Sequence, residues 1–282
     1  MGRPLVVVAF EGWNDAGEAA SLALSHLSRA WGAQTFASID PEEFYDFTET
    51  RPEVRLGAGH RRSIHWPEVE LLHARTPPGP SGRGRDLVLV RGVEPQLRWR
   101  SFSRLLAGVA RSYEAEMAII LGALLADVPH TRPVRVSASA DDEALASRLG
   151  LARSLYEGPT GILGVLHEAL SAAGVPSARL WASVPHYVHQ MASPKAALAL
   201  VQRSAELLGA PVDPSALLVA ADEYERMVSE RVAADDDAAS YVAQLEEADD
   251  AETARSATSL SADPDRLAEE VERFLRRHHG GS

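Results

Sequence analysis

Short apolar segments alternate with amphipathic segments over residues 1–210 of this chain. The apolar segments have the length and composition of buried strands: Leu5–Phe10, Thr35–Ile39, Leu87–Arg91, Met117–Gly122, Val134–Ser139 and Arg179–Val184. The amphipathic segments follow the helical period: Ala16–Trp31, Trp99–Ser112, Asp141–Leu149, Gly161–Ala173 and Pro194–Leu208. Strands that alternate with helices favour parallel pairing with helical crossovers. We therefore expect an α/β protein with a three-layer α/β/α sandwich.

Smaller signals complete this part of the chain. The segments Arg61–His65 and Glu68–Ala74 predict a hairpin, and the Pro- and Gly-rich segment Thr76–Arg85 predicts a loop. Asp40, followed by Pro41, has the pattern of a helix start, with the aspartate as N-cap, and Asp141 is the expected N-cap of the helix Asp141–Leu149.

The composition changes after residue 212, where the chain becomes acidic and helical. The segment Asp222–Arg255 holds twelve acidic residues and three arginines, a large share of a net charge of −12. The sequence predicts helices at Ser215–Ala233, Ala238–Glu247 and Pro264–Arg277, with a polar link at Asp249–Ser261. We therefore expect a sandwich domain over residues 1–212 and an acidic helical C-terminal extension over residues 213–282.

Charge and composition exclude several classes of function. An acidic chain lacks the basic face that a nucleic-acid partner requires. The absence of cysteine excludes disulfides and thiolate metal sites. The apolar run Met117–Ala126 is half of the roughly 20 residues that a membrane span needs. The N-terminal segment has no signal-peptide pattern. We expect a cytoplasmic protein with neither nucleic acid nor a membrane as partner.

Cofactor and metal motifs are missing from the sequence as well. Lys195 is the only lysine, no GxxxxGK[ST] loop is present, and the glycines of GPTG do not form a GxGxxG fingerprint. His186 and His189 in the segment HYVH match a zinc site poorly. No GxSxG elbow indicates a hydrolase. We expect no cofactor and no metal.

The end of the first predicted strand, Glu11-Gly12-Trp13-Asn14-Asp15, is the first candidate site. Ligands of open α/β sheets bind beyond the carboxyl ends of strands. Gly12 suits a turn, and Asn14 or Asp15 suits a helix N-cap, so a plain strand-to-helix corner explains most of the segment. A cap needs no indole, and Trp13 therefore indicates contact with a ligand or a partner.

Three later segments contribute further candidates. Gly92 and Glu94 follow the strand Leu87–Arg91, where a carboxylate can act as a base or pair with an arginine. Thr160 and Gly161 precede a helix, with Thr160 as the expected cap. His186 and Tyr187 follow the last predicted strand.

Lys195 follows the expected N-cap Ser193. A cation in the first turn opposes the helix dipole, which indicates either an anionic ligand or an internal salt bridge.

Several segments together carry a resemblance to a known family. AFEGWNDAGEAAS, DPEEFYDFTETRP, VRGVEPQLRWRSF, YEGPTGILGVL and SVPHYVHQMASPKAALALV, in this order, resemble the actinobacterial branch of the proteasome assembly chaperone 2 family. The resemblance covers about residues 4–210. It implies a sandwich of the phosphorylase/hydrolase-like type and a homo-oligomer, with a trimer as the first guess. It implies no catalytic residues, because the bacterial branch has no agreed reaction.

Two kinds of function follow from these observations. The resemblance and the lack of a complete catalytic set favour a non-catalytic protein-binding module that acts in the assembly of the proteasome or of another complex. The alternative is an enzyme or sensor for a small nucleoside, phosphate or carboxylate, with the strand-end residues lining its pocket. In a purely structural interpretation, Trp13 and Trp99 are buried against a neighbouring subunit instead.

Overall fold

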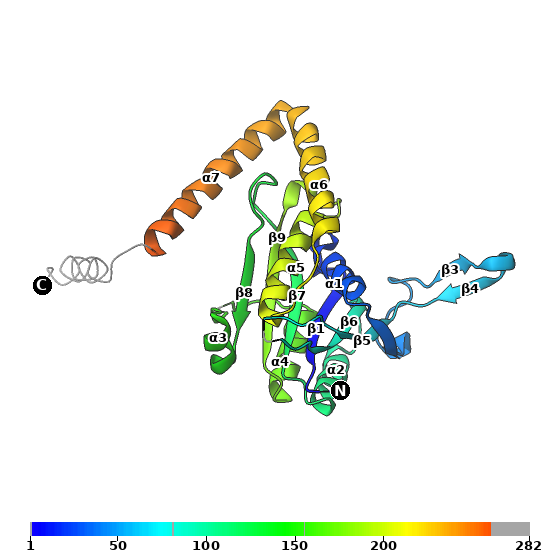
Figure 1. Cartoon of the computed structure of the whole chain (residues 1–282). Coiled ribbons are helices and arrows are strands. Elements are labelled where there is room, and N and C mark those ends of the chain that lie inside the picture. The colour runs from blue at the N-terminus through cyan, green and yellow to red at the C-terminus, as the bar shows by residue number, and fades with distance from the viewer. Residues whose placement is uncertain (1, 81, 155, 261–282) are drawn as a thin grey trace, which may run out of the picture. The chain divides into compact units, whose positions relative to one another are not determined.

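The computed structural model describes residues 2–80, 82–154 and 156–260 (Figure 1). The chain forms two compact units, of which the first ends at Ser229 and the second begins at Glu230. The boundary expected between residues 212 and 213 stays a prediction of domain organisation.

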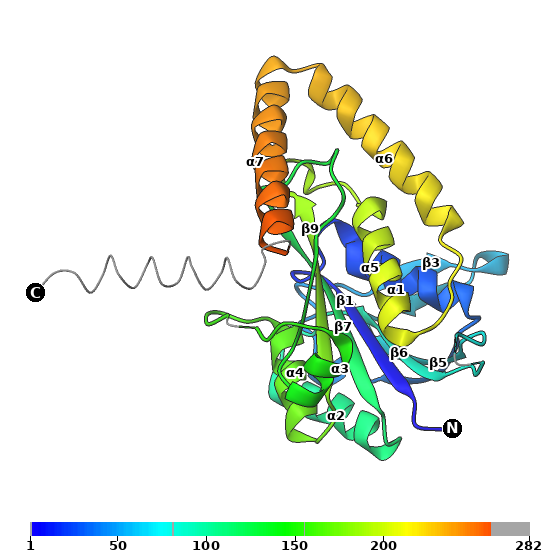
Figure 2. The same ribbon diagram turned by 60° about the vertical axis from the view of Figure 1, so that its left-hand side comes forward.

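A seven-stranded sheet forms the centre of the first unit, in the order β2-β5-β6-β1-β7-β9-β8 (Figure 2). The central strands β6, β1, β7 and β9 pair in parallel, and the pairs β2–β5, β5–β6 and β8–β9 are antiparallel. The strands are β1 (Leu5–Glu11), β2 (Gln34–Ile39), β5 (Val69–Arg75), β6 (Asp86–Val93), β7 (Met117–Ala126), β8 (Val136–Ala140) and β9 (Ser177–Pro185).

Helices cover both faces of this sheet, which confirms the predicted α/β/α fold class (Figures 1 and 2). On one face lie α1 (Ala19–Ala30) and α5 (Pro194–Leu208), and on the other lie α2 (Trp99–Ser112) and α4 (Ile162–Ala172). The short helix α3 (Glu143–Leu149) follows β8. Alternate residues of β1 enter the two cores, with Val7 in one and Val8 in the other.

The predicted parallel pairing holds only for the centre of the sheet. Strands β5 and β6 are joined directly by residues 76–85, without a helix, and a connection of this kind produces an antiparallel pair. Strands β2 and β5 also pair in antiparallel fashion without an α-helix between them, whereas β8 pairs in antiparallel fashion with β9 although α3 and α4 lie between these two strands.

The predicted hairpin of Arg61–His65 with Glu68–Ala74 is wrong. The first segment, β4 (Arg62–His65), pairs with β3 (Glu53–Leu56) in a separate two-stranded sheet. The second becomes β5, whose apolar side chains are buried in the main sheet. Burial decides between these partners, because β5 is apolar enough for the core and β4 is exposed along its length.

Side-chain caps define several helix starts. Asp40 accepts a hydrogen bond from the Glu42 N–H at 2.9 Å, and Ser193 accepts one from the Ala196 N–H, as the sequence predicts. The cap of α3 is Asp142, not Asp141, because the Asp141 carboxylate pairs with Arg179 and His167.

The helix α4 begins without a side-chain cap, so Thr160 is not the N-cap, and Gly161 occupies that position.

Two long helices follow the sandwich, α6 (Ser215–Ala233) and α7 (Asp236–Leu260). Helix α6 has the predicted bounds. The polar link expected at Asp249–Ser261 is wrong over its described part, because α7 continues to Leu260. The segment has neither Gly nor Pro and is rich in Ala, so nothing in it interrupts the helix. The helix predicted at Pro264–Arg277 lies outside the described residues.

A buried polar network ties α4 to the sheet at the amino end of β9. The imidazole of His167 lies 2.6 Å from both the Ser177 hydroxyl and the Asp141 carboxylate. Burial lowers the pKa of His167, so the ring is neutral and donates from Nε2 to Asp141, while Nδ1 accepts from Ser177. Burial opposes ionisation of Asp141, but the hydrogen bond from His167 and the charge of Arg179 outweigh it and lower the pKa.

This network has the residue types of a Ser-His-Asp triad but not its accessibility. Ser177 is 3% exposed and His167 is 7% exposed, so a substrate cannot reach the serine oxygen. The hydrogen bonds therefore hold the fold together.

We predict that His167→Ala lowers the free energy of unfolding by about 2–4 kcal/mol, because it leaves a cavity and an unpaired Ser177 hydroxyl. Urea denaturation at pH 7.5 measures the loss. The exposed neighbour Glu168→Ala is the control and should change stability little. Since folding lowers the pKa of His167, wild-type stability falls as pH drops below about 6.5, and the difference between wild type and variant shrinks there. A constant difference down to pH 5 would contradict this role.

Candidate functional site

The chain leaves β1 through a tight corner at Gly12. Its φ of 128° lies in the region that favours glycine. The Asp15 N–H donates to the Gly12 carbonyl at 3.1 Å and closes the turn. On the neighbouring strand, the Glu94 N–H donates to the Glu11 carbonyl at 2.8 Å. The ends of β1 and β6 are therefore joined beyond the last pair of the ladder.

The carboxylate of Glu94 holds this corner in place. One oxygen accepts from the Trp13 backbone N–H and the other from the Asn14 side-chain Nδ2, both at 3.0 Å. A Cβ at Gly12 would lie 2.7 Å from Glu94 Cγ, so only glycine lets the carboxylate approach the turn. The structure thus brings together the two motifs that the sequence places at separate strand ends.

Asn14 links the corner to two more elements. Asn14 is 2% exposed, and its backbone carbonyl accepts from the Ala123 N–H of β7 at 2.8 Å. A Cβ at Gly161 would lie 2.7 Å from the Asn14 amide nitrogen, so the start of α4 packs directly against this side chain. The ends of β1, β6 and β7 and the start of α4 therefore meet around one buried asparagine.

Gly92 supports the same region from strand β6. A Cβ there would lie 2.1 Å from the Glu68 carbonyl oxygen, and the φ of 152° is also unfavourable for other residues. This glycine therefore allows β5 to approach the end of β6 closely. Its role is in the backbone, two residues before Glu94.

Asp15 is buried behind the corner and binds the first turn of α1, although the N-cap position of that helix is Glu18. Its carboxylate accepts from the Ala20 N–H at 2.7 Å and from the Ser21 N–H at 3.3 Å. Burial raises the pKa of Asp15 to about 6, against the lowering effect of these hydrogen bonds. The pKa of this carboxyl is therefore shifted toward neutrality, as is frequent in functional sites and also in buried caps.

Trp13 differs from its neighbours because its indole is open to solvent. The side chain is 71% exposed, although the backbone N–H of the same residue donates a hydrogen bond to Glu94. Glu11 beside it is exposed as well. The backbone of the corner is therefore held in place, and an aromatic ring projects from it. Helix capping does not explain the presence of that ring.

A second cluster surrounds Lys195 at the start of α5. Its Nζ donates to the His130 carbonyl and to the Glu225 carboxylate of α6. The internal salt bridge that the sequence allowed is therefore present. Ser193, two residues earlier, donates its backbone N–H to the Gly17 carbonyl at 2.7 Å, so the start of α5 contacts the segment just after the first corner.

His130 belongs to this second cluster, and the sequence analysis missed it. Its ring and its backbone N–H both lie 2.8 Å from the Tyr187 hydroxyl, and its Nε2 lies 2.9 Å from the Ser229 hydroxyl. Nδ1 of His186, next to Tyr187, lies 3.1 Å from the Asp127 carboxylate. No motif distinguishes His130, because a single histidine in a loop has no spacing to detect.

The predicted site residues therefore divide between two clusters. Glu11, Gly12, Trp13, Asn14, Asp15, Gly92, Glu94 and Gly161 form or support the first, which we call the Trp13 corner. Tyr187 and Lys195 meet at His130 in the second. Thr160 is exposed, and its hydroxyl lies against Gly164.

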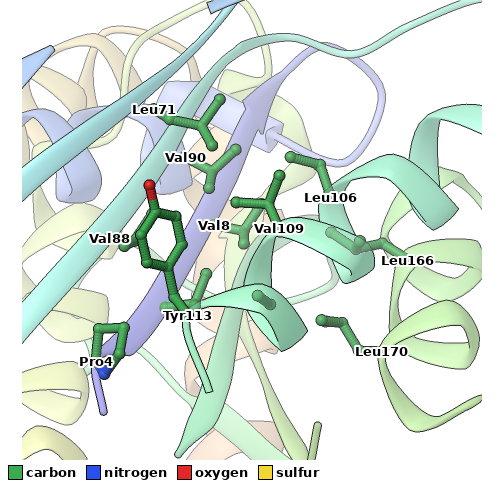
Figure 3. Close-up of a pocket in the computed structure, with 12 residues that line it drawn as sticks. Pro4, Val8, Leu71, Val88, Val90, Leu106, Val109, Tyr113, Leu166 and Leu170 are labelled. Carbon is green, nitrogen blue, oxygen red and sulfur yellow. The ribbon is translucent and has the colours of Figure 1, made fainter. Parts of the chain in front are cut away.

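Three hollows formed by described residues lie away from both clusters. Figure 3 shows one between the sheet and helices α2 and α4, where Val8, Val90, Leu106 and Leu166 point toward one another. With a volume of about 10 Å³ it holds at most one water molecule. One wider surface hollow has Arg3 and Val175 among its lining residues, and another has Pro78 and Pro214. No predicted site residue lines either hollow.

Other kinds of site receive no support from the described ranges. Within residues 2–80, 82–154 and 156–260, no three histidine or acidic side chains are grouped as a metal ion would require. Over the same part of the chain, no helix combines the length and apolar character needed to cross a membrane.

Comparison with known proteins identifies the family. The PAC2 family matches residues 9–232. The chain belongs to the PAC2 family. A PAC2 family protein from Streptomyces avermitilis is 47% identical, with a TM-score of 0.78, over 85% of this chain and 99% of the other.

Two further solved structures are similar to this chain. A proteasome-assembly chaperone homologue from Mycobacterium tuberculosis is 45% identical, with a TM-score of 0.75, over 84% of this chain and 99% of the other. An archaeal proteasome activator from Pyrococcus furiosus is 19% identical, with a TM-score of 0.62, over 81% and 93% of the two chains, and shares the fold. Among curated proteins, no match is found. The relatives from Streptomyces avermitilis and Mycobacterium tuberculosis confirm the resemblance to the actinobacterial branch.

We predict that Asp15→Asn stabilises the protein at neutral pH. The amide oxygen can still accept from the Ala20 N–H, and the penalty for a buried charge is removed. Because folding raises the pKa of Asp15 from 3.8 to about 6, wild-type stability falls as pH rises through that interval. The stability of the variant does not fall in this way, and its free energy of unfolding at pH 7 should exceed that of the wild type by roughly 1–3 kcal/mol. Urea denaturation between pH 4 and 8 measures both curves, with the exposed Glu18→Gln as control. Parallel curves for wild type and Asp15→Asn would refute the assignment.

Proposed function

We propose that this protein is a non-catalytic binding module that acts in proteasome assembly, with the Trp13 corner as a contact site for a proteasome α-subunit. The relative from Mycobacterium tuberculosis described as a proteasome-assembly chaperone homologue supports the choice of partner. The exposure of Trp13 on a rigid corner is the observation that carries the choice of surface.

A projecting tryptophan suits protein recognition for two reasons. It contributes a large apolar area, and tryptophan is enriched among the few residues that dominate binding energy. Its backbone is already ordered by the hydrogen bond to Glu94, so less conformational entropy is lost when a partner covers it. Both properties favour a protein surface as the occupant.

The side chains of Glu94 and Asn14 in the corner, and of Lys195 in the second cluster, are already engaged within the chain. Both oxygens of Glu94 accept hydrogen bonds, and the Asn14 amide donates one of them. The Lys195 ammonium is paired with Glu225. A small molecule would have to displace these contacts, whereas a protein partner covering Trp13 would leave them intact. The shifted pKa of Asp15 is the observation that favours the alternative, a small-ligand enzyme or sensor.

We predict that Trp13→Ala weakens binding to purified proteasome α-subunits by roughly tenfold or more, as expected for a central aromatic contact. Biolayer interferometry measures the affinity, and native gels follow the rate at which α-subunits assemble. The folded state should be unaffected, because the indole is largely exposed.

Phe36→Ala is the matched control, since Phe36 is an exposed aromatic residue on the edge strand β2. It should bind like the wild type. Absence of binding by the wild-type protein would refute the proposed function. Equal affinity of wild type and Trp13→Ala would refute the assignment of the surface.

A further inference from the structure

The hairpin formed by β3 and β4 has an apolar face that no described part of the chain covers. Val54, Leu56 and Ile64 are 62%, 66% and 59% exposed. Within the described residues the two strands pair only with each other, and Figure 1 shows them standing apart from the seven-stranded sheet. Exposed apolar side chains that stand singly are normal, but a contiguous set on one face marks an interaction surface.

The register of the hairpin shows that the apolar residues share one side. Val54 lies opposite Ile64, and Leu56 lies opposite Arg62. Directly opposed residues of an antiparallel pair point to the same face, and alternate residues do so along a strand. The other face is polar, with the Ser63 hydroxyl 3.2 Å from the His65 ring. We call the face with Val54, Leu56, Arg62 and Ile64 the hairpin face.

This arrangement is unfavourable for a chain in isolation. A two-stranded hairpin is at best marginally stable in water, and its stability comes from an apolar face packed against something else. At its base, Trp66 packs against Phe47 with ring centroids 4.8 Å apart, which anchors one end only. The hairpin face therefore needs a partner surface.

The charge of the hairpin restricts the partner. The segment Arg51–His65 holds four arginines and one glutamate in a chain whose net charge is −12. Arg61 and Arg62 have no ion-pair partner among the residues that the structure describes. A second hairpin would repel this segment, so an acidic surface with some apolar area is the complementary partner.

Helix α6 presents such a surface. Leu217, Ala221, Tyr224 and Val228 are buried on one side of it, whereas Leu218 and Val219 are 43% and 69% exposed on the other. One turn further along this exposed side lie Asp222 and Glu223, which are also exposed, and Glu223 pairs with Arg226 of the same helix at 3.9 Å. Leu218, Val219, Asp222 and Glu223 form what we call the helix face. In the described chain, both the hairpin face and the helix face are open to solvent.

We propose that the hairpin face of one copy of this protein docks on the helix face of a second copy. Val54, Leu56 and Ile64 would pack against Leu218 and Val219, and Arg62 would face Asp222. The contact joins two different surfaces of the same chain, so it is heterologous, and such contacts close into rings when the rotation permits. A homo-oligomer of this kind would cover both faces in every copy.

The experiment compares oligomeric mass by sedimentation velocity and light scattering over a range of protein concentrations. We expect the wild type to associate and the triple variant Val54→Ser, Leu56→Ser, Ile64→Ser to associate at least roughly tenfold more weakly. Circular dichroism checks that each variant is folded. A monomeric wild type, or a triple variant that associates as strongly as the wild type, would overturn the proposal.

A charge exchange tests which surface the hairpin contacts. Arg62→Glu and Asp222→Arg should each weaken association, because each places like charges together, and the double variant should regain part of the loss. Arg104→Glu on α2 is the matched control, an exposed arginine outside both faces, and should associate like the wild type. If the double variant is no better than the single variants, the helix face is not the partner and the proposal fails.

Discussion

Strand β1 is buried on both faces, and this constraint determines where the molecule can present polar groups. Every residue from Leu5 to Phe10 is buried, with alternate side chains in the two cores. Burial of each large apolar side chain contributes about 1.5–3 kcal/mol, so the strand tolerates no polar residue along its length. Polar chemistry begins only at Glu11, where the chain leaves the sheet. The Trp13 corner follows from that position.

The corner is rigid because its polar groups satisfy one another. Glu94 accepts from a backbone amide and from the side chain of Asn14, and Asn14 in turn fills the space left by Gly161. A buried polar group without a partner costs about 1–3 kcal/mol of stability. Substitution of one hydrogen-bonded residue of the corner therefore leaves another residue of the corner without its partner, at that cost. Four segments of the chain therefore determine together the geometry of the backbone that carries the Trp13 ring.

The sequence predicts the local elements well and the strand partners less well. The helices Trp99–Ser112, Pro194–Leu208 and Ser215–Ala233 have the predicted bounds, because their period and end signals are contained in the segments themselves. The partner of β5 depends instead on which surface buries its apolar side chains, and no local signal carries that information. The same holds for β8, whose antiparallel pairing with β9 spans two helices of intervening chain.

The candidate site was predictable to a similar extent. The rule that parallel strands end at one edge of a sheet places Glu11 and Glu94 near each other, and the structure joins their segments by a hydrogen bond. The Glu94 carboxylate accepts hydrogen bonds from the corner instead of being available to a ligand. Sequence spacing cannot show these side-chain contacts. His130 was missed because it acts through Tyr187 and Ser229, which are distant in the sequence.

The only lysine of the chain shows how such contacts decide between interpretations. In the first turn of α5, a cation opposes the helix dipole, so the position needs a compensating anion. Glu225 supplies it, and the His130 carbonyl accepts a second hydrogen bond. A compact ammonium on a flexible stem can serve these two acceptors, whereas the planar fork of arginine suits a single carboxylate. Because α6 holds Glu225 beside Lys195, a free anion would compete against a high effective concentration of carboxylate. Lys195 therefore fastens α6 to the sandwich, and the acidic character of that helix serves the fold as well as its exposed face.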